Sequence, residues 1–285
     1  MKDVKIGIIG GSGVYDIEGV KLVKNLKITT PFGNPSDDIK IGDINGIKIA
    51  FLPRHGIGHR FTPSEVNYRA NIFALKKIGV EKIISVSASG SLKEEIKPRD
   101  FVIPDQLYDR TKGRPSTFFG NGIVAHVGFA NPFCPGIRKI LVETARELKL
   151  PVHDGGTYVC MEGPQFSTKA ESKANRALGF SIIGMTNIPE SKLAREAEMC
   201  YATIALATDY DVWKENEEVS VEKVVNNMKF LASNVKLLIK ASVAKLSSAG
   251  SCSCQEALKY AIMTSPEVIN KKTKKKLNVL LEKYL

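Results

Sequence analysis

Short runs of apolar, largely β-branched residues recur along the chain and predict the strands of a buried sheet. The first run begins almost at the N-terminus, and turn-forming glycine and proline residues are distributed along the chain rather than pooled in one place. The predicted strands cover residues 4–9, 46–53, 82–88, 100–104, 156–161, 181–185 and 202–208.

Helical periodicity fills several of the intervals between these strands. Pro135 and Pro189 stand at or near predicted helix starts, where the missing amide proton of proline costs nothing. The predicted helices cover residues 64–78, 136–148, 169–178, 189–200 and 219–245. Strands that alternate with helices predict a layered α/β architecture around a largely buried sheet.

The same pattern predicts how the chain divides. No glycine- and proline-rich linker interrupts it before about residue 245, and 285 residues can bury a large core. We therefore expect one domain over residues 1–285. Residues 245–285 form a helical C-terminal extension of it, which carries Cys252-Ser253-Cys254.

Composition excludes some locations and partners. No stretch approaches the roughly 18 uninterrupted apolar residues of a membrane span. The chain runs from Met1 into a strand without the features of a secretory signal, so a cytoplasmic protein is expected. The formal charge is +11, but the lysines are spread along the chain, and the dense run at 271–276 lies on a predicted helix. A solvated helix face explains that run better than a nucleic-acid patch, and a positive chain suits a phosphate substrate.

Five cysteines are few for a disulfide framework and odd in number. The spacing of Cys252-Ser253-Cys254 is tighter than that of an ordinary zinc knuckle, and no second pair in the sequence completes a four-ligand site, so no metal site is expected. Three interpretations of this motif remain open: a reactive thiol, a strained disulfide, or a chance pair of solvent-exposed cysteines without a role.

Two segments are candidates for binding an anion. Gly10-Gly11-Ser12-Gly13 follows the first strand and can turn backbone amides inward, although a tight structural turn is an equal alternative. It is not a dinucleotide fingerprint, because Asp16 occupies the third glycine position. Arg54-His55-Gly56 ends another strand, and a guanidinium can grip phosphate at two points, a surface salt bridge being the alternative. For His59 we find no further metal ligands.

Three further strand ends carry polar side chains that could bind a substrate or transfer a proton. Hydroxyl and small residues crowd 85–91, Met185-Thr186 offers a hydroxyl beside an apolar surface, and Asp209 and Asp211 follow the last predicted strand. Two carboxylates one residue apart on an extended segment point the same way, and one of them should have a raised pKa and act as a proton donor. Helix capping is the alternative for either aspartate. Together these strand ends describe a pocket with anion donors on one side and an acid on the other, as phosphorolysis of an N-glycoside requires.

Seven segments resemble one known family in order and spacing, between about residues 4 and 238. They are GIIGGSG at 7–13, TPFGNPS at 30–36, RHG at 54–56, PSEVNY at 63–68, EGPQFS at 162–167, GMT at 184–186 and ATDYDVW at 207–213. The chain resembles the 5′-methylthioadenosine phosphorylases, in the trimeric branch of the purine nucleoside phosphorylases. The resemblance implies their α/β fold, with a central mixed β-sheet flanked by helices.

The resemblance also implies a role for individual residues. Phosphate is expected to contact Ser12, Arg54, His55, Ser87, Thr186 and the backbone of Ala88. Met185 should pack under the ribose, and Phe166 near the base with Ser167 beside it. Asp209 should face purine N7 as general acid, and Asp211 should accept from the 6-amino group. His126, Val221 and Val224 should line the methylthio end, with His126 contributed by a neighbouring subunit; a structural histidine is the alternative.

The implied reaction converts 5′-methylthioadenosine and phosphate to adenine and 5-methylthioribose 1-phosphate, without a metal or organic cofactor. The implied partners are the nucleoside and phosphate alone, in a homotrimer or a dimer of trimers. Tails with a CxC motif resemble those of heat-loving archaeal relatives, which implies disulfides Cys252–Cys254 and Cys134–Cys200, with Cys160 free. A broad phosphorylase acting on adenosine, inosine or guanosine is the alternative function.

Overall fold

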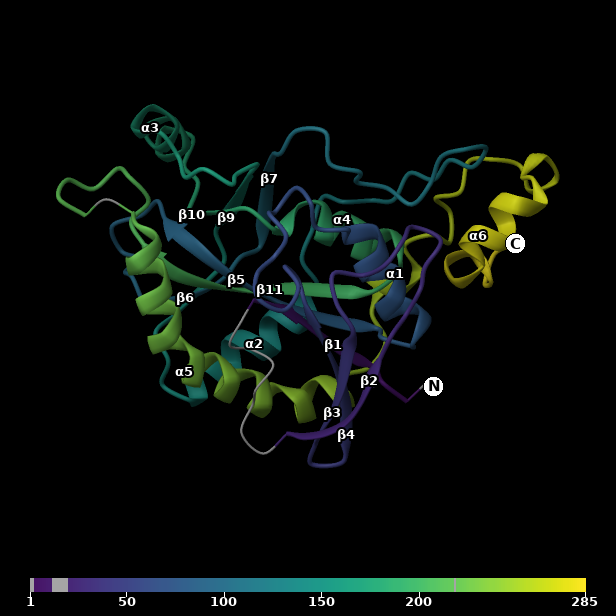
Figure 1. Ribbon diagram of the computed structural model, residues 1–285, viewed down its shortest axis with the longest axis horizontal. Coiled ribbons are helices and arrows are strands. Elements are labelled where there is room, and N and C mark those ends of the chain that lie inside the picture. The colour runs from purple at the N-terminus through teal and green to yellow at the C-terminus, as the bar shows by residue number, and fades with distance from the viewer. Residues whose placement is uncertain (1–2, 12–19, 218) are drawn as a thin grey trace.

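The computed structural model describes residues 3–11, 20–217 and 219–285. Its strands form one mixed sheet with helices on both faces (Figure 1). The strands are β1 (Ile6–Gly10), β2 (Lys21–Leu26), β3 (Ile39–Ile44), β4 (Ile47–Pro53), β5 (Lys82–Ser91), β6 (Phe101–Ile103), β7 (Gln106–Arg110), β8 (Val152–Asp154), β9 (Thr157–Met161), β10 (Ile182–Gly184) and β11 (Cys200–Asp209). The helices are α1 (Tyr68–Lys77), α2 (Pro135–Glu147), α3 (Lys169–Ala177), α4 (Asn187–Glu196), α5 (Val221–Ser248) and α6 (Lys271–Leu281). The predicted α/β class is confirmed.

All seven predicted strands are present, and four further strands were missed. Every side chain of β2 is at least partly exposed, and β7 likewise has no buried residue. The strand β8 is only three residues long. Such strands carry no run of buried apolar residues, which is the signal that identified the others. The missed strand β3 does alternate in the sequence IKIGDI, which is a recognisable strand pattern.

Two helix boundaries differ from the prediction by four residues, and the others by no more than three. Helix α1 begins at Tyr68 rather than at residue 64, because the Asn67 side chain accepts a hydrogen bond from the Ala70 amide and caps the helix there. Helix α4 ends at Glu196, so the predicted extension to residue 200 was wrong. The backbone reverses at Glu198, where φ is +54°, and Cys200 already pairs with β5 as the first residue of β11.

Strand β5 is the branch point of the sheet. It pairs along most of its length with β11, in parallel. On its other side, β1 pairs with residues 82–85, and β10 pairs antiparallel with Gly90 and Ser91. Residues 86–89 therefore have no strand partner on that side among the described residues. This opening lies at the carboxyl ends of β1, β4 and β11, where open α/β sheets bind ligands.

Two apolar cores cover the faces of the sheet. Ile6 and Ile8 of β1 pack with residues of α2 and α5 on one face, while Ile9 packs with α1 and α4 on the other. The C-terminal extension joins the second core through buried residues such as Leu277, and the lysines of α6 line its outer side. Among the helices of the described ranges, none is long and apolar enough to cross a membrane.

Four of the five cysteines converge, contrary to the sequence argument that no second pair completes a four-ligand site. Cys134 precedes α2, Cys200 begins β11, and Cys252 and Cys254 follow α5. All five cysteines are free thiols, so neither implied disulfide is formed in the structure. Cys160 lies apart from the group, buried in β9.

Candidate active site

A cavity of about 900 Å³ opens where β4, β5, β10 and β11 end. This volume is in the range of pockets that hold small molecules. The predicted site residues that line it are Arg54, His55, Ser87, Ala88, Phe166, Met185, Thr186, Asp209, Asp211, Val221 and Val224. Of the other predicted site residues, Ser12 falls outside the described ranges, and Ser167 and His126 do not line the cavity.

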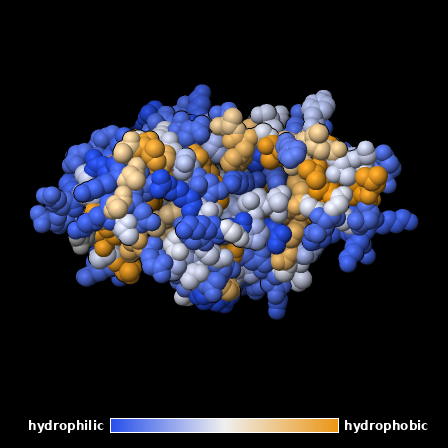
Figure 2. Space-filling model, turned by 90° about the horizontal axis from the view of Figure 1, so that it is seen from above, coloured by the Kyte–Doolittle hydropathy of each residue, from blue (hydrophilic) through white to orange (hydrophobic). Residues whose placement is uncertain are grey.

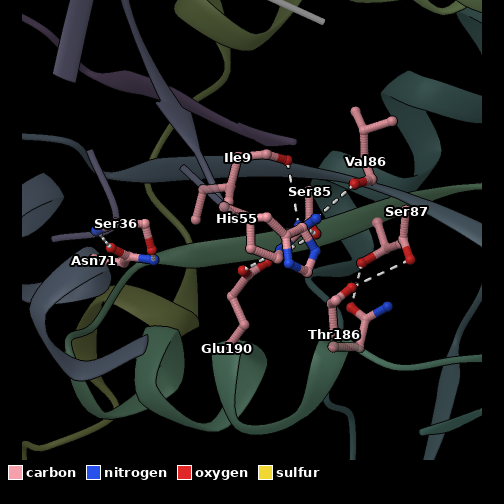
Figure 3. Close-up of polar contacts among 12 residues, drawn as sticks. Ile9, Ser36, His55, Asn71, Ser85, Val86, Ser87, Thr186 and Glu190 are labelled. Atoms are coloured by element: carbon pink, nitrogen blue, oxygen red, sulfur yellow. Dashed lines mark hydrogen bonds and ion pairs between the residues drawn. The ribbon is translucent and has the colours of Figure 1, made fainter. Parts of the chain in front are cut away.

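Arg54 is held by a buried ion pair. Its Nε donates to Glu190 Oε2 at 2.7 Å and its Nη2 to Glu190 Oε1 at 2.9 Å. Glu190 reaches in from α4 and also accepts from Ser85 Oγ at 2.8 Å (Figure 3). Burial alone would lower the pKa of Arg54, but the Glu190 carboxylate outweighs it and the pKa is raised. The alternative of a surface salt bridge is therefore wrong, because both side chains are almost completely buried.

The ion pair leaves Arg54 one N–H for a ligand. Nη2 contacts Ser85 Oγ at 2.6 Å besides Glu190, so both of its protons are used. Nη1 has two protons but, among the described residues, one acceptor, the Val86 carbonyl at 2.9 Å. Since Arg54 also lines the cavity, the second Nη1 proton can be given to an anion there.

His55 and a group of hydroxyls stand beside Arg54. His55 Nδ1 lies 2.9 Å from the Phe61 carbonyl, an acceptor, so Nδ1 carries the proton and Nε2 is left as an acceptor. Burial and the Arg54 charge lower the pKa of His55 to about 4, which keeps the ring neutral near pH 7. Ser87 Oγ lies 3.3 Å from Thr186 Oγ1 (Figure 3). It also lies 3.1 Å from the Tyr158 hydroxyl.

Two buried carboxylates also line the cavity. Asp209 accepts hydrogen bonds from Thr208 Oγ1 at 2.6 Å and from the Asp211 amide at 2.8 Å. Asp211 Oδ2 is buried and has no hydrogen-bond partner among the described residues. Burial raises the pKa of both aspartates. An unpartnered buried acceptor is costly, which indicates that a ligand donor completes it.

The backbone brings these carboxylates together in a way that simple strand alternation does not describe. A bulge in β11 shifts its register between Ala207 and Asp209, and Asp211 lies beyond the strand with φ +53°. Gly90 lies directly opposite, where a Cβ atom would come within 2.9 Å of Asp209 Oδ1. The sequence argument from alternation was therefore wrong in its geometry, although both carboxylates do line the cavity.

One wall of the cavity is apolar. Helix α5 contributes Val221, Val224, Val225, Met228 and Ala232, at the spacing of a single helical face. Phe166 and Val221 are 41% and 67% exposed, so this part of the cavity is open at its edge.

Two predicted residues do not line the cavity. Ser167 is buried beside it, where its hydroxyl contacts Met161 Sδ at 3.8 Å and also lies near Asp211, whose pKa it lowers against the effect of burial. His126 is exposed, and its amide donates to the Ala261 carbonyl at 2.8 Å. Within the described part of this single chain, His126 therefore does not reach the pocket.

Comparisons with known proteins agree with this fold and site. Residues 5–244 match the model of the phosphorylase superfamily. An S-methyl-5′-thioadenosine phosphorylase of Geobacter sulfurreducens is 52% identical, covering 98% of this chain and 99% of its own. One from Koribacter versatilis is 53% identical, covering 98% and 96%. The crystal structure of a methylthioadenosine phosphorylase from an antarctic soil metagenomic library superposes with a TM-score of 0.94 at 50% identity, covering 99% of this chain and all of the other.

This chain belongs to the 5′-methylthioadenosine phosphorylases of the phosphorylase superfamily. The family resemblance inferred from the sequence motifs is thereby confirmed, as is the nucleoside phosphorylase fold. A variant of an adenosine/methylthioadenosine phosphorylase from Schistosoma mansoni, solved in complex with methylthioadenosine, has a TM-score of 0.85 at 40% identity. That alignment covers 90% of this chain and 96% of the other.

In this phosphorylase, three buried residues that the sequence did not indicate support the pocket. Glu190 pairs with Arg54 from 136 positions away, and the Tyr158 hydroxyl reaches Ser87 across Gly184, where any Cβ would collide with it. Arg114 donates from Nη1 to the carbonyl oxygens of Met185 and Ile188, at 2.7 and 2.8 Å. It thereby fixes the turn that presents Met185 and Thr186. None of the three stands in a motif, so only the tertiary contacts identify them.

Proposed function

We propose that this chain catalyses the phosphorolysis of 5′-methylthioadenosine to adenine and 5-methylthioribose 1-phosphate. The observation that carries this proposal is the arrangement of one cavity. It is lined both by an arginine, a neutral histidine and clustered hydroxyls, and by a protonatable carboxylate close in sequence to an unpartnered one. The relatives that share the fold over nearly the whole chain carry this activity in their names.

Phosphate is held, in this proposal, at the carboxyl ends of β4 and β5. The second Nη1 proton of Arg54 and the hydroxyls of Ser87 and Thr186 donate to it, together with the backbone at Ala88. His55 Nε2, an acceptor when the ring is neutral, accepts a hydrogen bond from the O–H of monohydrogen phosphate. Because Glu190 neutralises Arg54 and the pocket is buried, these donors are held in place before the anion arrives.

The adenine base is bound at the carboxylate side. Asp211 Oδ2 accepts from the exocyclic 6-amino group and so acquires the partner that it lacks. Asp209, whose pKa is raised by burial, donates a proton to N7. Its Oδ1 is occupied by the Asp211 amide, so the proton resides on Oδ2, and the Thr208 hydroxyl then donates to the Ser89 carbonyl, 3.3 Å away.

The reaction follows from this placement. Proton donation at N7 by Asp209 stabilises the departing adenine while the bond to C1′ lengthens. The ribosyl group gains oxocarbenium character, and the phosphate anion stabilises that charge and attacks C1′ from the opposite face. Met185 packs under the ribose and fixes the direction of attack. The co-substrate is inorganic phosphate, and the reaction requires no metal or organic cofactor.

The methylthio group lies against the apolar wall of α5, where Val221 and Val224 stand with Val225 and Met228. The open edge of this wall supports closure by a second subunit, and we infer that His126 of a neighbouring copy completes it.

Large apolar side chains exposed on the chain, among them Ile57 and Tyr108, are available for contacts between subunits. Figure 2 shows hydrophobic patches on an otherwise hydrophilic face. A trimer or a dimer of trimers, in the cytoplasm, is our proposal for the assembly, with residues 245–285 part of the same domain.

A broader purine nucleoside phosphorylase is the second candidate. The name of the Schistosoma mansoni relative includes adenosine. An apolar pocket rejects an added hydroxyl by only about a hundredfold, so adenosine should be a slower substrate rather than an excluded one. Inosine and guanosine carry a 6-oxo group, an acceptor that would face the acceptor Oδ2 of Asp211, and this contact disfavours both.

The experiment that tests the function is release of free base from 5′-methylthioadenosine, adenosine and inosine, each with and without phosphate. Phosphate-dependent release, fastest from 5′-methylthioadenosine, supports the proposal. Equal rates on inosine would make the broader function correct instead. Release that is independent of phosphate would indicate a hydrolase and refute both candidates.

A further inference from the structure

Four cysteine thiols meet at a point far from the catalytic cavity. Their Sγ atoms all lie within 4.8 Å of one another, and those of Cys134 and Cys252 are 3.6 Å apart. Cys134, Cys200 and Cys254 are buried, and Cys252 is half-buried. Cys200 begins β11 and Asp209 ends it, so the cluster and the general acid are separated by roughly 30 Å of strand.

The spacing of these sulfur atoms matches a tetrahedral metal centre. Zinc binds thiolate sulfur at about 2.3 Å, and four such ligands at tetrahedral angles lie about 3.8 Å from one another. The Cys134–Cys252 pair, at 3.6 Å, is close to that value, and none of the four sulfur atoms is more than 4.8 Å from another. A disulfide joins only two sulfurs, so it gives no reason for all four to converge from three separate segments.

The surroundings also suit a group of thiolates. Cys134 is the N-cap residue of α2, so negative charge on its sulfur lies at the positive end of a helix. The backbone of Cys134 is fixed by its amide, which donates to the Tyr201 carbonyl at 2.7 Å. Gln255 holds Cys252 in turn, because its side-chain Oε1 accepts from the Cys252 amide at 3.1 Å. Such outer contacts orient ligands before a metal binds.

We propose that Cys134, Cys200, Cys252 and Cys254 bind one zinc ion as a closed, four-sulfur structural site. Binding releases the four thiol protons and leaves a centre with a net charge of −2, so no oxidant or reductant is required. With all four positions filled by protein, the ion has no place for water and takes no part in phosphorolysis. Its function is to fasten the chain after α5 to the start of α2 and of β11.

The test uses the full chain, reduced with a thiol reductant, loaded with zinc chloride and freed of excess metal on a desalting column. Elemental analysis should find about one zinc per chain in the native protein and in the control Cys160→Ser, which removes the cysteine outside the cluster. The double variant Cys252→Ser/Cys254→Ser should retain less than about a tenth of that amount. Cobalt(II) in place of zinc should give the intense thiolate-to-metal absorption of a tetrahedral sulfur site.

The proposal is overturned if the reduced native chain, with five thiols titrated under denaturation, retains no more zinc than the double variant. It is also overturned if the chain forms two disulfides in air and, once reduced, still takes up no zinc. Should the double variant fail to fold, the native protein alone decides. Modification of its thiols with a mercurial must release about one zinc per chain into a metal indicator dye, and release of none refutes the site.

Discussion

The substitution Asp211→Asn tests how the pocket recognises the base. Asp211 is 3% exposed, and its Oδ2 has no partner among the described residues. Its φ of +53° is a left-handed conformation that asparagine adopts readily, so the backbone should accept the change. Asparagine keeps the shape of the side chain but removes its charge and offers the cavity an NH₂ group.

The size of the effect follows from the lost hydrogen bond. A buried hydrogen bond to a charged group contributes about 1.5–3 kcal/mol, which corresponds to a factor of about 10–150 in kcat/KM for 5′-methylthioadenosine. The kcat/KM for the 6-oxo analogue 5′-methylthioinosine should rise, because the new NH₂ group can donate a hydrogen bond to the 6-oxo oxygen. Burial raises the pKa of Asp211, so replacing it with a neutral amide should not lower the stability of the fold.

The assay compares kcat/KM on these two substrates, which share the 5′ group and differ only in the base. The ratio of 5′-methylthioadenosine to 5′-methylthioinosine should fall at least about tenfold in the variant. The control Asp38→Asn changes an exposed carboxylate outside the cavity and should leave the ratio unchanged. An unchanged ratio in a folded Asp211→Asn protein would refute the assignment of Asp211 to the 6-amino group.

Three other substitutions give distinct outcomes. Glu190→Gln leaves the buried Arg54 charge uncompensated and should cost about 3–5 kcal/mol, a fall of about 6–20 °C in Tm by calorimetry. The exposed control Glu94→Gln should leave Tm nearly unchanged, and equal shifts would contradict the buried-pair argument. Asp209→Asn cannot donate a proton and should lower kcat about 10²–10⁴-fold without loss of stability; activity within threefold of native would show that Asp209 is not the acid. Because the pKa of His55 falls from 6.5 to about 4 on folding, the unfolded chain binds more protons between these values, so about 3 kcal/mol of stability is present above pH 6.5 and lost as the pH drops through 4. The variant His55→Asn keeps a donor for the Phe61 carbonyl but cannot titrate in this range. Its free energy of unfolding, measured with urea, should therefore depend less steeply on pH between 6.5 and 4 than that of the native protein. An equally steep dependence would show that the pKa of His55 is not lowered on folding.

Much of the fold was predictable because most strands are buried on both faces. A strand such as β11, in which all ten residues are buried, is apolar over most of its length, and the sequence shows this directly. Strands with exposed side chains, such as β2, give no such signal and were missed. The candidate site was predictable in a similar way, because residues at the ends of buried strands gather at one edge of a sheet.

Pairings between distant residues were not predictable. Arg54 suggested an anion site, but its buried partner Glu190 lies 136 positions away on a helix whose sequence gives no sign of it. The same holds for Cys134 and Cys200, which looked unrelated to Cys252 and Cys254 until the fold joined them. Charge and thiol chemistry depend on the distance between side chains, and sequence separation does not give that distance.

The sequence by itself therefore determined the order of the elements and the residue types that stand at the strand ends. Its period-two and period-3.6 patterns reflect which side chains avoid water, and that is a local property of each element. The tertiary structure alone decided that β5 changes partners to open a cavity, and that a bulge in β11 and a left-handed Asp211 bring two carboxylates together. These features arise from close packing between segments. A glycine such as Gly90 leaves room for a neighbouring carboxylate, and a register shift between paired strands changes which side chains come into contact.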